Sequence, residues 1–137
     1  MKRTAKAHWE GNLKEGKGQL SAPSGILENT NYSFKTRFEE GVKGTNPEEL
    51  LAAAHAGCFT MAVSAMLTEK GLSAKSLDTE AILTMENLTI TGIHLVIKGS
   101  VEGIDAQGFE EVTKNAEKHC VISKALSVAI TSEATLV

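Results

Sequence analysis

The sequence predicts an α+β fold in which antiparallel sheets pack around a long central helix. Three observations predict this class. Residues 3–43 read as short strands separated by glycine-containing turns, and residues 46–70 carry a long apolar helical pattern. Residues 76–101 alternate in polarity as strands do. Because no repeat or linker interrupts this order, we expect a single domain over residues 1–137.

Glycine divides the first third of the chain into short segments. Glycine-containing turns fall within residues 9–12, 15–18 and 23–25. Further on, Tyr32, Phe34 and Thr36 alternate with polar residues. This period of two predicts a half-buried strand that ends near Phe38.

The central helix has the clearest start and stop signals. Asn46 can cap it, Pro47 suits the first helical position, and Glu49 gives a spacing like that of a capping box. The helix then runs to Lys70 and ends at Gly71. It is apolar nearly all round, so we expect it to be buried. A chain of 137 residues has little material to cover a helix of ~36 Å on every side, so a partner subunit is expected to supply the cover.

The last part of the chain predicts a hairpin, two shorter helices and a closing strand. Residues 76–86 and 89–101 form the hairpin, and Asp105 can cap the helix that follows. A short third helix is expected to start near Cys120, and residues 127–137 should close the sheet. Ile93, Leu95 and Ile97 are expected on one face of the hairpin, with His94, Val96 and Lys98 on the other. Phe109, Val112 and Ala116 are expected on the buried stripe of the helix.

Composition excludes several classes of partner. Apolar residues make up 42% of the chain and charged residues 23%, as in ordinary globular proteins. The net charge of −3 leaves no basic excess for nucleic acid, and no basic block is dense enough for a membrane surface. The apolar stretch from Leu50 to Leu67 contains His55, Thr60 and Ser64, so we expect a buried helix rather than a membrane span.

No secretory signal is expected, because residues 1–8 lack an apolar segment. The expected location is therefore the cytoplasm, which is reducing. Two cysteines there indicate free thiols, a redox couple or metal ligands rather than a structural disulfide.

Cys58 and Cys120 are the first candidates for chemistry. Cys58 lies in the middle of the central helix, where the helix dipole gives no help, so a thiolate there needs a neighbouring cation. Cys120 lies near an expected helix start, where free N–H groups favour a thiolate. The alternative for both is a small buried apolar residue, in which case the chain would be a non-catalytic module that binds a small molecule. Two cysteines on helices that are expected to pack together also predict a redox couple.

A zinc site is a further alternative. His55, Cys58, His119 and Cys120 offer two nitrogens and two sulfurs, which suits tetrahedral zinc. Against this alternative, the chain has no CxxC motif, and adjacent residues such as His119 and Cys120 are an awkward pair of ligands for one metal.

Arg37 and Glu48 are the remaining candidates. Arg37 is expected at a strand end, just before a glycine-containing connection, and Glu48 falls in the first turn of the central helix. Taken one at a time, they read as a solvated arginine and as a carboxylate that complements the helix dipole.

Together these residues resemble the OsmC/Ohr family of hydroperoxide reductases, and specifically its osmotically inducible protein C branch. The matching segments are Ala7-His8-Trp9-Glu10-Gly11, Thr36-Arg37-Phe38-Glu39, Lys43-Gly44-Thr45-Asn46-Pro47-Glu48-Glu49-Leu50, Ala53-Ala54-His55-Ala56-Gly57-Cys58-Phe59 and Cys120-Val121-Ile122-Ser123. The run ending in Cys58-Phe59 is the most specific. Relatives usually carry proline directly after the second cysteine, and this chain has Val121 there.

The resemblance implies a cysteine-based peroxidase without a bound cofactor or metal. It implies that Cys58 attacks an organic hydroperoxide and that Cys120 resolves the sulfenic acid to a disulfide. Arg37 and Glu48 would activate the first thiol, and a dithiol reductant, of lipoyl type by resemblance, would restore both thiols. Apolar groups such as Phe38, Phe59 and Ile122 are expected to favour organic peroxides.

The resemblance also implies an interleaved homodimer with two active sites at its interface. The residues independently favour sites shared between chains. Glu48 and Cys58 lie ten residues apart on one predicted helix, which is ~15 Å of rise, beyond the reach of a Glu–Arg pair. Antiparallel packing of two central helices would bring Glu48 of one chain near Cys58 of the other. The alternatives are a kink near Gly57 or a loop path that lets Arg37 span the gap alone.

Overall fold

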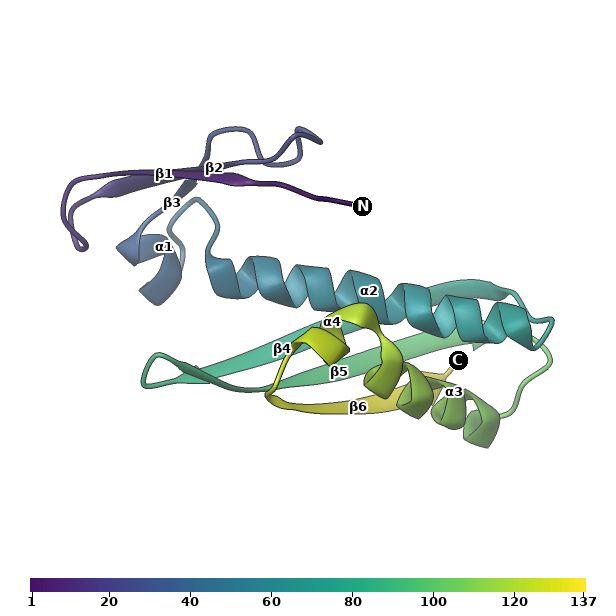
Figure 1. Ribbon diagram of the computed structural model, residues 1–137. Coiled ribbons are helices and arrows are strands. Elements are labelled where there is room, and N and C mark those ends of the chain that lie inside the picture. Colours follow the sequence, from purple (N-terminus) through teal and green to yellow (C-terminus); the bar gives the residue numbers. More distant parts are fainter. The chain divides into compact units, whose positions relative to one another are not determined.

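The computed structural model describes residues 1–137, which form two compact units, residues 1–50 and residues 51–137. The predicted α+β class is confirmed. Six strands form two three-stranded sheets, and four helices accompany them (Figure 1).

The first unit contains a small antiparallel sheet in the order β1-β2-β3. Its strands are β1 (Lys6–Glu10), β2 (Lys17–Ser21) and β3 (Thr30–Tyr32). Gly18 lies beneath the rings of Trp9 and Tyr32, whose centroids are 5.6 Å apart. A Cβ at this position would approach the Trp9 ring to 2.7 Å and the Tyr32 ring to 2.4 Å, so only glycine lets the two aromatic rings meet here.

The prediction of a strand ending near Phe38 was wrong, because helix α1 (Phe34–Phe38) follows β3. The Ser33 hydroxyl accepts from the Thr36 N–H at 3.2 Å, and the Thr36 hydroxyl accepts from the Ser33 N–H at 2.8 Å. This reciprocal capping box starts a helix in place of a strand. The rings of Phe34 and Phe38, four residues apart, then pack at 4.8 Å.

Helix α2 (Pro47–Glu69) confirms both predicted ends. The Asn46 side chain accepts from the Glu49 N–H at 2.8 Å. At the other end Gly71 has φ +75°, and its N–H and that of Leu72 bond to carbonyls of the last turn. This is the Schellman arrangement that glycine permits. By length and composition alone, α2 could cross a membrane.

The second unit is built on a sheet in the order β4-β5-β6. Strands β4 (Ala74–Glu86) and β5 (Thr89–Val101) form the predicted hairpin, with positive φ at Asn87 and Leu88 in its turn. Strand β6 (Ala129–Leu136) pairs with β5 in parallel, so the expectation of purely antiparallel sheets needs correction here. The reason is the connection, because α3 and α4 carry the chain back to the end of the sheet where β5 begins.

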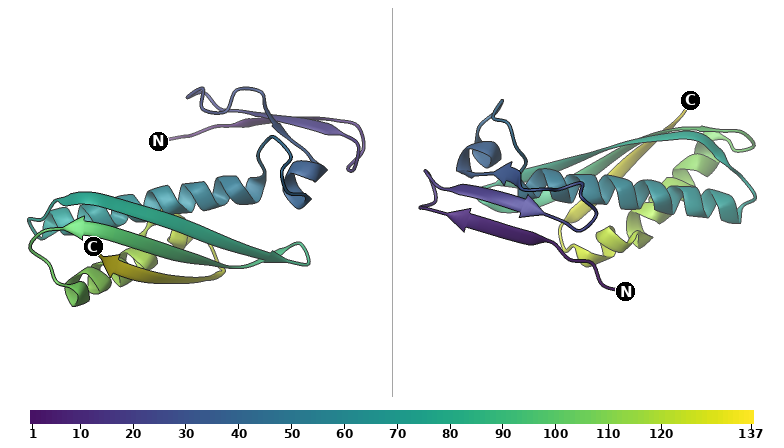
Figure 2. Two further views of the ribbon diagram at one scale, coloured as in Figure 1. Left: turned by 180° about the vertical axis from the view of Figure 1, so that it is seen from behind. Right: turned by 90° about the horizontal axis from the view of Figure 1, so that it is seen from above.

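Three helices lie on one face of this sheet: α2, α3 (Ala106–His119) and α4 (Val121–Ala125), as Figures 1 and 2 show. Asp105 caps α3 as predicted, with its carboxylate accepting from the Gly108 N–H at 2.7 Å. Cys120 is the cap residue of α4, so that helix starts where expected with Val121 in its first position.

The core lies between these helices and the sheet. Phe59, Val63 and Leu67 of α2 are fully buried, and so are Leu95 and Ile97 of β5. The three α2 residues recur every four positions and define a single buried stripe. The rest of α2 is half-buried or exposed within this chain, including Met61, which is 75% exposed.

Candidate functional site

Arg37 and Glu48 meet in a two-pronged ion pair. The Arg37 Nε donates to Glu48 Oε1 at 2.9 Å and to Oε2 at 3.1 Å, and Nη2 donates to Oε1 as well. The Asn46 side chain, which caps α2, also donates to the Thr36 carbonyl of α1 at 3.1 Å. That bond ties the start of α2 to α1, so two capped helices aim Arg37 and Glu48 at each other.

The pair is ionised. Burial raises the pKa of Glu48, but the hydrogen bonds from Arg37 and from the backbone, together with the Arg37 charge, outweigh this effect and lower its pKa overall. The Glu48 side chain is 14% exposed, whereas Arg37 is 39% exposed. The carboxylate therefore fixes the guanidinium, and the remaining donors of Arg37 stay available to a ligand.

An apolar cavity of about 180 Å³ lies beside Arg37 in the first unit. It is lined by Trp9, Leu13, Tyr32, Ser33, Phe34, Arg37, Phe38 and Pro47. A cation at the edge of an aromatic pocket suits a ligand that is polar at one end and hydrocarbon at the other. Of the apolar residues expected near substrate, Phe38 lines this cavity, whereas Phe59 is fully buried in the core.

Both cysteines are free thiols in the second unit, and they differ in exposure. Cys58, in the middle of α2, is half-buried and packs against the core cluster that contains Cys120. Cys120 is 2% exposed. Its sulfur accepts from the Ser123 N–H at 3.2 Å and lies 3.0 Å from the Ser123 hydroxyl. The thiol that solvent reaches more easily is therefore Cys58.

His55 acquires a partner that the sequence did not indicate. Its Nε2 lies 2.8 Å from the Ser123 hydroxyl, and the ring is fully buried. Burial lowers the pKa of His55, so the imidazole is neutral. A histidine within an apolar helical run was the available signal, but Ser123 is 68 positions away and could not be paired with it from the sequence.

The four residues weighed as zinc ligands do not form a four-ligand metal site in this structure. His119 is exposed and hydrogen-bonds through Nδ1 to the Asn115 carbonyl at 2.9 Å, whereas Cys120 turns inward to Ser123. No group of three or more histidine, cysteine or acidic side chains has the geometry of a metal site.

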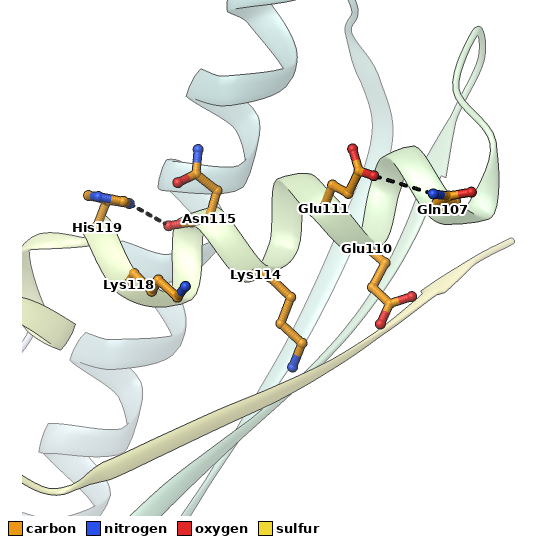
Figure 3. A pocket seen from close by; sticks show the side chains of 7 residues that line it. All are labelled: Gln107, Glu110, Glu111, Lys114, Asn115, Lys118 and His119. Carbon is orange, nitrogen blue, oxygen red and sulfur yellow. Dashed lines mark hydrogen bonds between the residues drawn. The ribbon is translucent and has the colours of Figure 1, made fainter.

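A surface hollow of about 530 Å³ lies along α3 and holds neither cysteine. Figure 3 shows its lining, which is Gln107, Glu110, Glu111, Lys114, Asn115, Lys118 and His119. The lining mixes charged and amide side chains. Two of its hydrogen bonds stay within α3, from Gln107 to Glu111 and from His119 to the Asn115 carbonyl, whereas Lys114 donates to the Ser132 carbonyl of β6. Because this hollow holds neither cysteine, the candidate redox chemistry stays with the two cysteines and the Arg37–Glu48 pair.

Comparisons with known proteins agree with the predicted resemblance. A family model described as OsmC-like protein matches residues 39–134. The protein named peroxiredoxin OsmC from Escherichia coli (strain K12) is 47% identical over 129 residues, covering 91% of this chain and 90% of that protein.

Two solved structures share the fold. The OsmC-like protein from Mycoplasma pneumoniae has a TM-score of 0.77 at 16% identity, over 100% of this chain and 98% of that one. The organic hydroperoxide resistance protein OhrB of Bacillus subtilis has a TM-score of 0.66 at 24% identity, over 98% of each chain. The chain therefore belongs to the family of OsmC-like proteins.

Proposed function

We propose that this chain is a thiol-dependent peroxidase that reduces organic hydroperoxides to alcohols. The observation that carries the proposal is a pair of free cysteines of unequal exposure on one core, half-buried Cys58 and buried Cys120. Such a pair suits a reaction in which one thiol meets the substrate and the other acts afterwards. The names of the relatives, peroxiredoxin and organic hydroperoxide resistance protein, support the same reaction class.

The reaction balances with the groups present. The Cys58 thiolate attacks one peroxide oxygen, so an S–O bond forms, the O–O bond breaks, and the alkoxide takes a proton and leaves as alcohol. Cys120 then attacks the sulfur of the sulfenic acid, an S–S bond forms, and the oxygen leaves as water. A dithiol reductant, which we propose to be of lipoyl type, reduces the disulfide and is itself oxidised to a disulfide.

Arg37 and Glu48 supply the charge that stabilises the Cys58 thiolate in this proposal. The middle of α2 offers Cys58 no helix-terminal dipole, so the charge that favours its thiolate has to come from a side chain. We assign this role to Arg37, which also holds a peroxide oxygen through its free donors. Glu48 fixes the guanidinium through the two-pronged pair.

The cavity beside Arg37 supports a hydrocarbon-bearing substrate. Aromatic rings from β1, β3 and α1 line it, and burial of a hydrocarbon group there contributes about 25 cal/mol per Å². Hydrogen peroxide has no such group and gains nothing from the cavity. The substrate class is therefore organic hydroperoxides.

A stopped-flow comparison tests this function. Reduced protein is mixed with cumene hydroperoxide or with hydrogen peroxide, and thiol oxidation is followed at several peroxide concentrations. We expect the second-order rate constant to be at least ~10-fold larger for cumene hydroperoxide than for hydrogen peroxide. Burial of its hydrocarbon group in the cavity contributes a free energy of ~1.5–2 kcal/mol, which corresponds to this factor. Equal rate constants for the two peroxides would contradict the proposed substrate class. If neither peroxide oxidises a thiol, the proposed peroxidase activity is wrong.

We further propose that the active protein is an interleaved homodimer with a single domain spanning residues 1–137 in each chain. None of the buried apolar core side chains comes from residues 1–50, and a three-stranded sheet is stable only when it has an apolar face to bury or packs against a helix. The exposed small residues of α2, among them Ala53, Gly57 and Ala65, leave a face on which a second helix can pack closely. Glu48 and Cys58 are separated by ten residues of continuous helix, ~15 Å of rise, so a shared site joins Arg37 and Glu48 of one chain to Cys58 of its partner.

Mixing two inactive variants distinguishes shared sites from sites confined to one chain. Cys58→Ser and Arg37→Ala subunits are unfolded together, refolded and assayed. A mixed dimer with shared sites keeps one site with both Cys58 and Arg37, so it should regain about half of the wild-type activity. If sites are confined to one chain, no mixture regains activity, and a protein that is monomeric at micromolar concentration would also exclude shared sites.

The location proposed for this protein is the cytoplasm. We assign α2 to the interior of the protein rather than to a membrane, because Phe59, Val63 and Leu67 on one of its faces are fully buried against the rest of the chain. A reducing compartment keeps both cysteines as thiols between turnovers, as the proposed cycle requires.

A further inference from the structure

A hydrogen-bonded chain of three side chains ends on the sulfur of Cys120. The Cys120 sulfur lies 3.0 Å from the Ser123 hydroxyl, and that hydroxyl lies 2.8 Å from Nε2 of His55. Cys120 and His55 are 2% and 0% exposed, and Ser123 is 7% exposed. A buried chain from a thiol through a hydroxyl to an imidazole is the arrangement that moves a proton without solvent.

The hydrogen bonds that link Cys120, Ser123 and His55 can run in either direction. With a thiol at Cys120, the S–H donates to the Ser123 oxygen and the Ser123 O–H donates to His55 Nε2. With a thiolate, Nε2–H donates to Ser123 and the Ser123 O–H donates to sulfur, which also receives the Ser123 backbone N–H at 3.2 Å. Burial holds the pKa of His55 below its ordinary value, so the resting ring is neutral. With the ring proton on Nδ1, which is buried and has no hydrogen-bond partner, the lone pair of Nε2 faces the Ser123 hydroxyl and is the position that takes the proton.

We propose that Ser123 and His55 form a proton relay that activates Cys120 for its attack on the sulfenic acid of Cys58. This inference rests on the proposed peroxidase function and assigns two further residues to its second step. The proton leaves Cys120 for Ser123 as the Ser123 proton passes to His55. The thiolate attacks the Cys58 sulfur, the S–O bond breaks, and the hydroxide recovers the proton and leaves as water.

The same contacts hold Cys120 beside the helix that carries Cys58. His55 precedes Cys58 by three residues on α2, so the two side chains are neighbours on the helix surface. The bond from Ser123 to His55 therefore fastens the first turn of α4, where Cys120 is the cap residue, next to the peroxide-reactive thiol. Ser123 touches the reacting sulfur, whereas His55 acts through Ser123 and is a positioning residue.

The test measures the lifetime of the Cys58 sulfenic acid after one equivalent of cumene hydroperoxide, by trapping with dimedone at increasing delays. Ser123→Ala should lengthen this lifetime ~100-fold or more, because general acid–base catalysis typically contributes roughly 10²- to 10⁴-fold. His55→Gln should lengthen it as much, because an amide can bond to Ser123 but cannot take a proton. Ser123→Thr keeps the hydroxyl and should restore most of the rate.

Thr113→Val is the matched control, since Thr113 is a fully buried residue of the same core whose hydroxyl has no partner. It should show the wild-type lifetime. A wild-type lifetime in His55→Gln would reduce the contact to a structural hydrogen bond and overturn the relay. An unchanged lifetime in Ser123→Ala would overturn it too. If Ser123→Ala does not fold, His55→Gln and Ser123→Thr decide the comparison.

A second arm separates the relay from the peroxidase. Diamide oxidises Cys58 by forming a sulfur–nitrogen adduct, and Cys120 then displaces the hydrazine to close the disulfide, without peroxide. Slow closure by Ser123→Ala and His55→Gln supports the relay even if peroxide oxidises no thiol, in which case only the proposed function is wrong. Closure as fast as in the wild type, with peroxide still consumed, means that only the relay is wrong.

Discussion

Cys58→Ser is expected to lower peroxide turnover to the rate of the uncatalysed reaction. A serine hydroxyl is not ionised near neutral pH and cannot take the place of the attacking thiolate. Consumption of cumene hydroperoxide in the presence of a dithiol reductant measures the effect. The variant should fold, because oxygen for sulfur is a small change at a half-buried position. Retention of most of the activity would exclude Cys58 as the peroxide-reactive thiol.

Cys120→Ser is the matched variant of the second thiol. It should still consume about one equivalent of peroxide per chain and then stop, because only the resolving step is lost. Mass spectrometry should find a sulfenic acid on Cys58. Continued turnover at the wild-type rate would show that the reductant acts directly on Cys58.

Arg37→Ala should slow peroxide attack by about 100- to 1,000-fold, the cost of removing one charge-stabilising donor from a reacting centre. The change removes the cation proposed to favour the Cys58 thiolate and leaves the Glu48 carboxylate, 14% exposed, without its partner. The measurement is the second-order rate constant for thiol oxidation, determined alongside the pH dependence of that rate. The pH at which Cys58 becomes reactive should rise.

Two comparisons make the Arg37 result specific. Arg37→Lys should recover little, because a point charge lacks the planar fork that bonds to both oxygens of Glu48. Lys35→Ala removes an exposed cation from the same short helix and should react as the wild type does. An Arg37→Ala variant with wild-type rate and pH dependence would contradict the assignment.

Local signals in the sequence predicted most of the fold. Asn46 with Pro47 at the start of α2, Gly71 at its end and Asp105 before α3 all act through backbone groups within a few residues. The alternation in β5 likewise follows from period two alone, and Ile93, Leu95 and Ile97, which were predicted to share one face, are all buried.

The predictions from sequence were wrong where two local patterns conflict, or where contacts between distant residues determine the structure. Residues 32–36 alternate like a strand, but the reciprocal Ser33–Thr36 hydrogen bonds form a helix there, which places Arg37 on α1. The parallel pairing of β6 depends on the path of α3 and α4, which no period in the sequence reveals. The partner of His55 is likewise a contact between distant segments. The residues matched by the family model, 39–134, include Glu48, Cys58 and Cys120, whereas Arg37 lies just before them.

A single-turnover reaction tests the central claim most directly. Reduced protein is mixed with one equivalent of cumene hydroperoxide, quenched with an alkylating agent, digested and analysed by mass spectrometry together with the released alcohol. The proposed mechanism predicts one cumyl alcohol per chain, a disulfide between Cys58 and Cys120, and no free thiol on either residue. Peroxide left unconsumed, or consumed while both cysteines remain alkylated as free thiols, would contradict it.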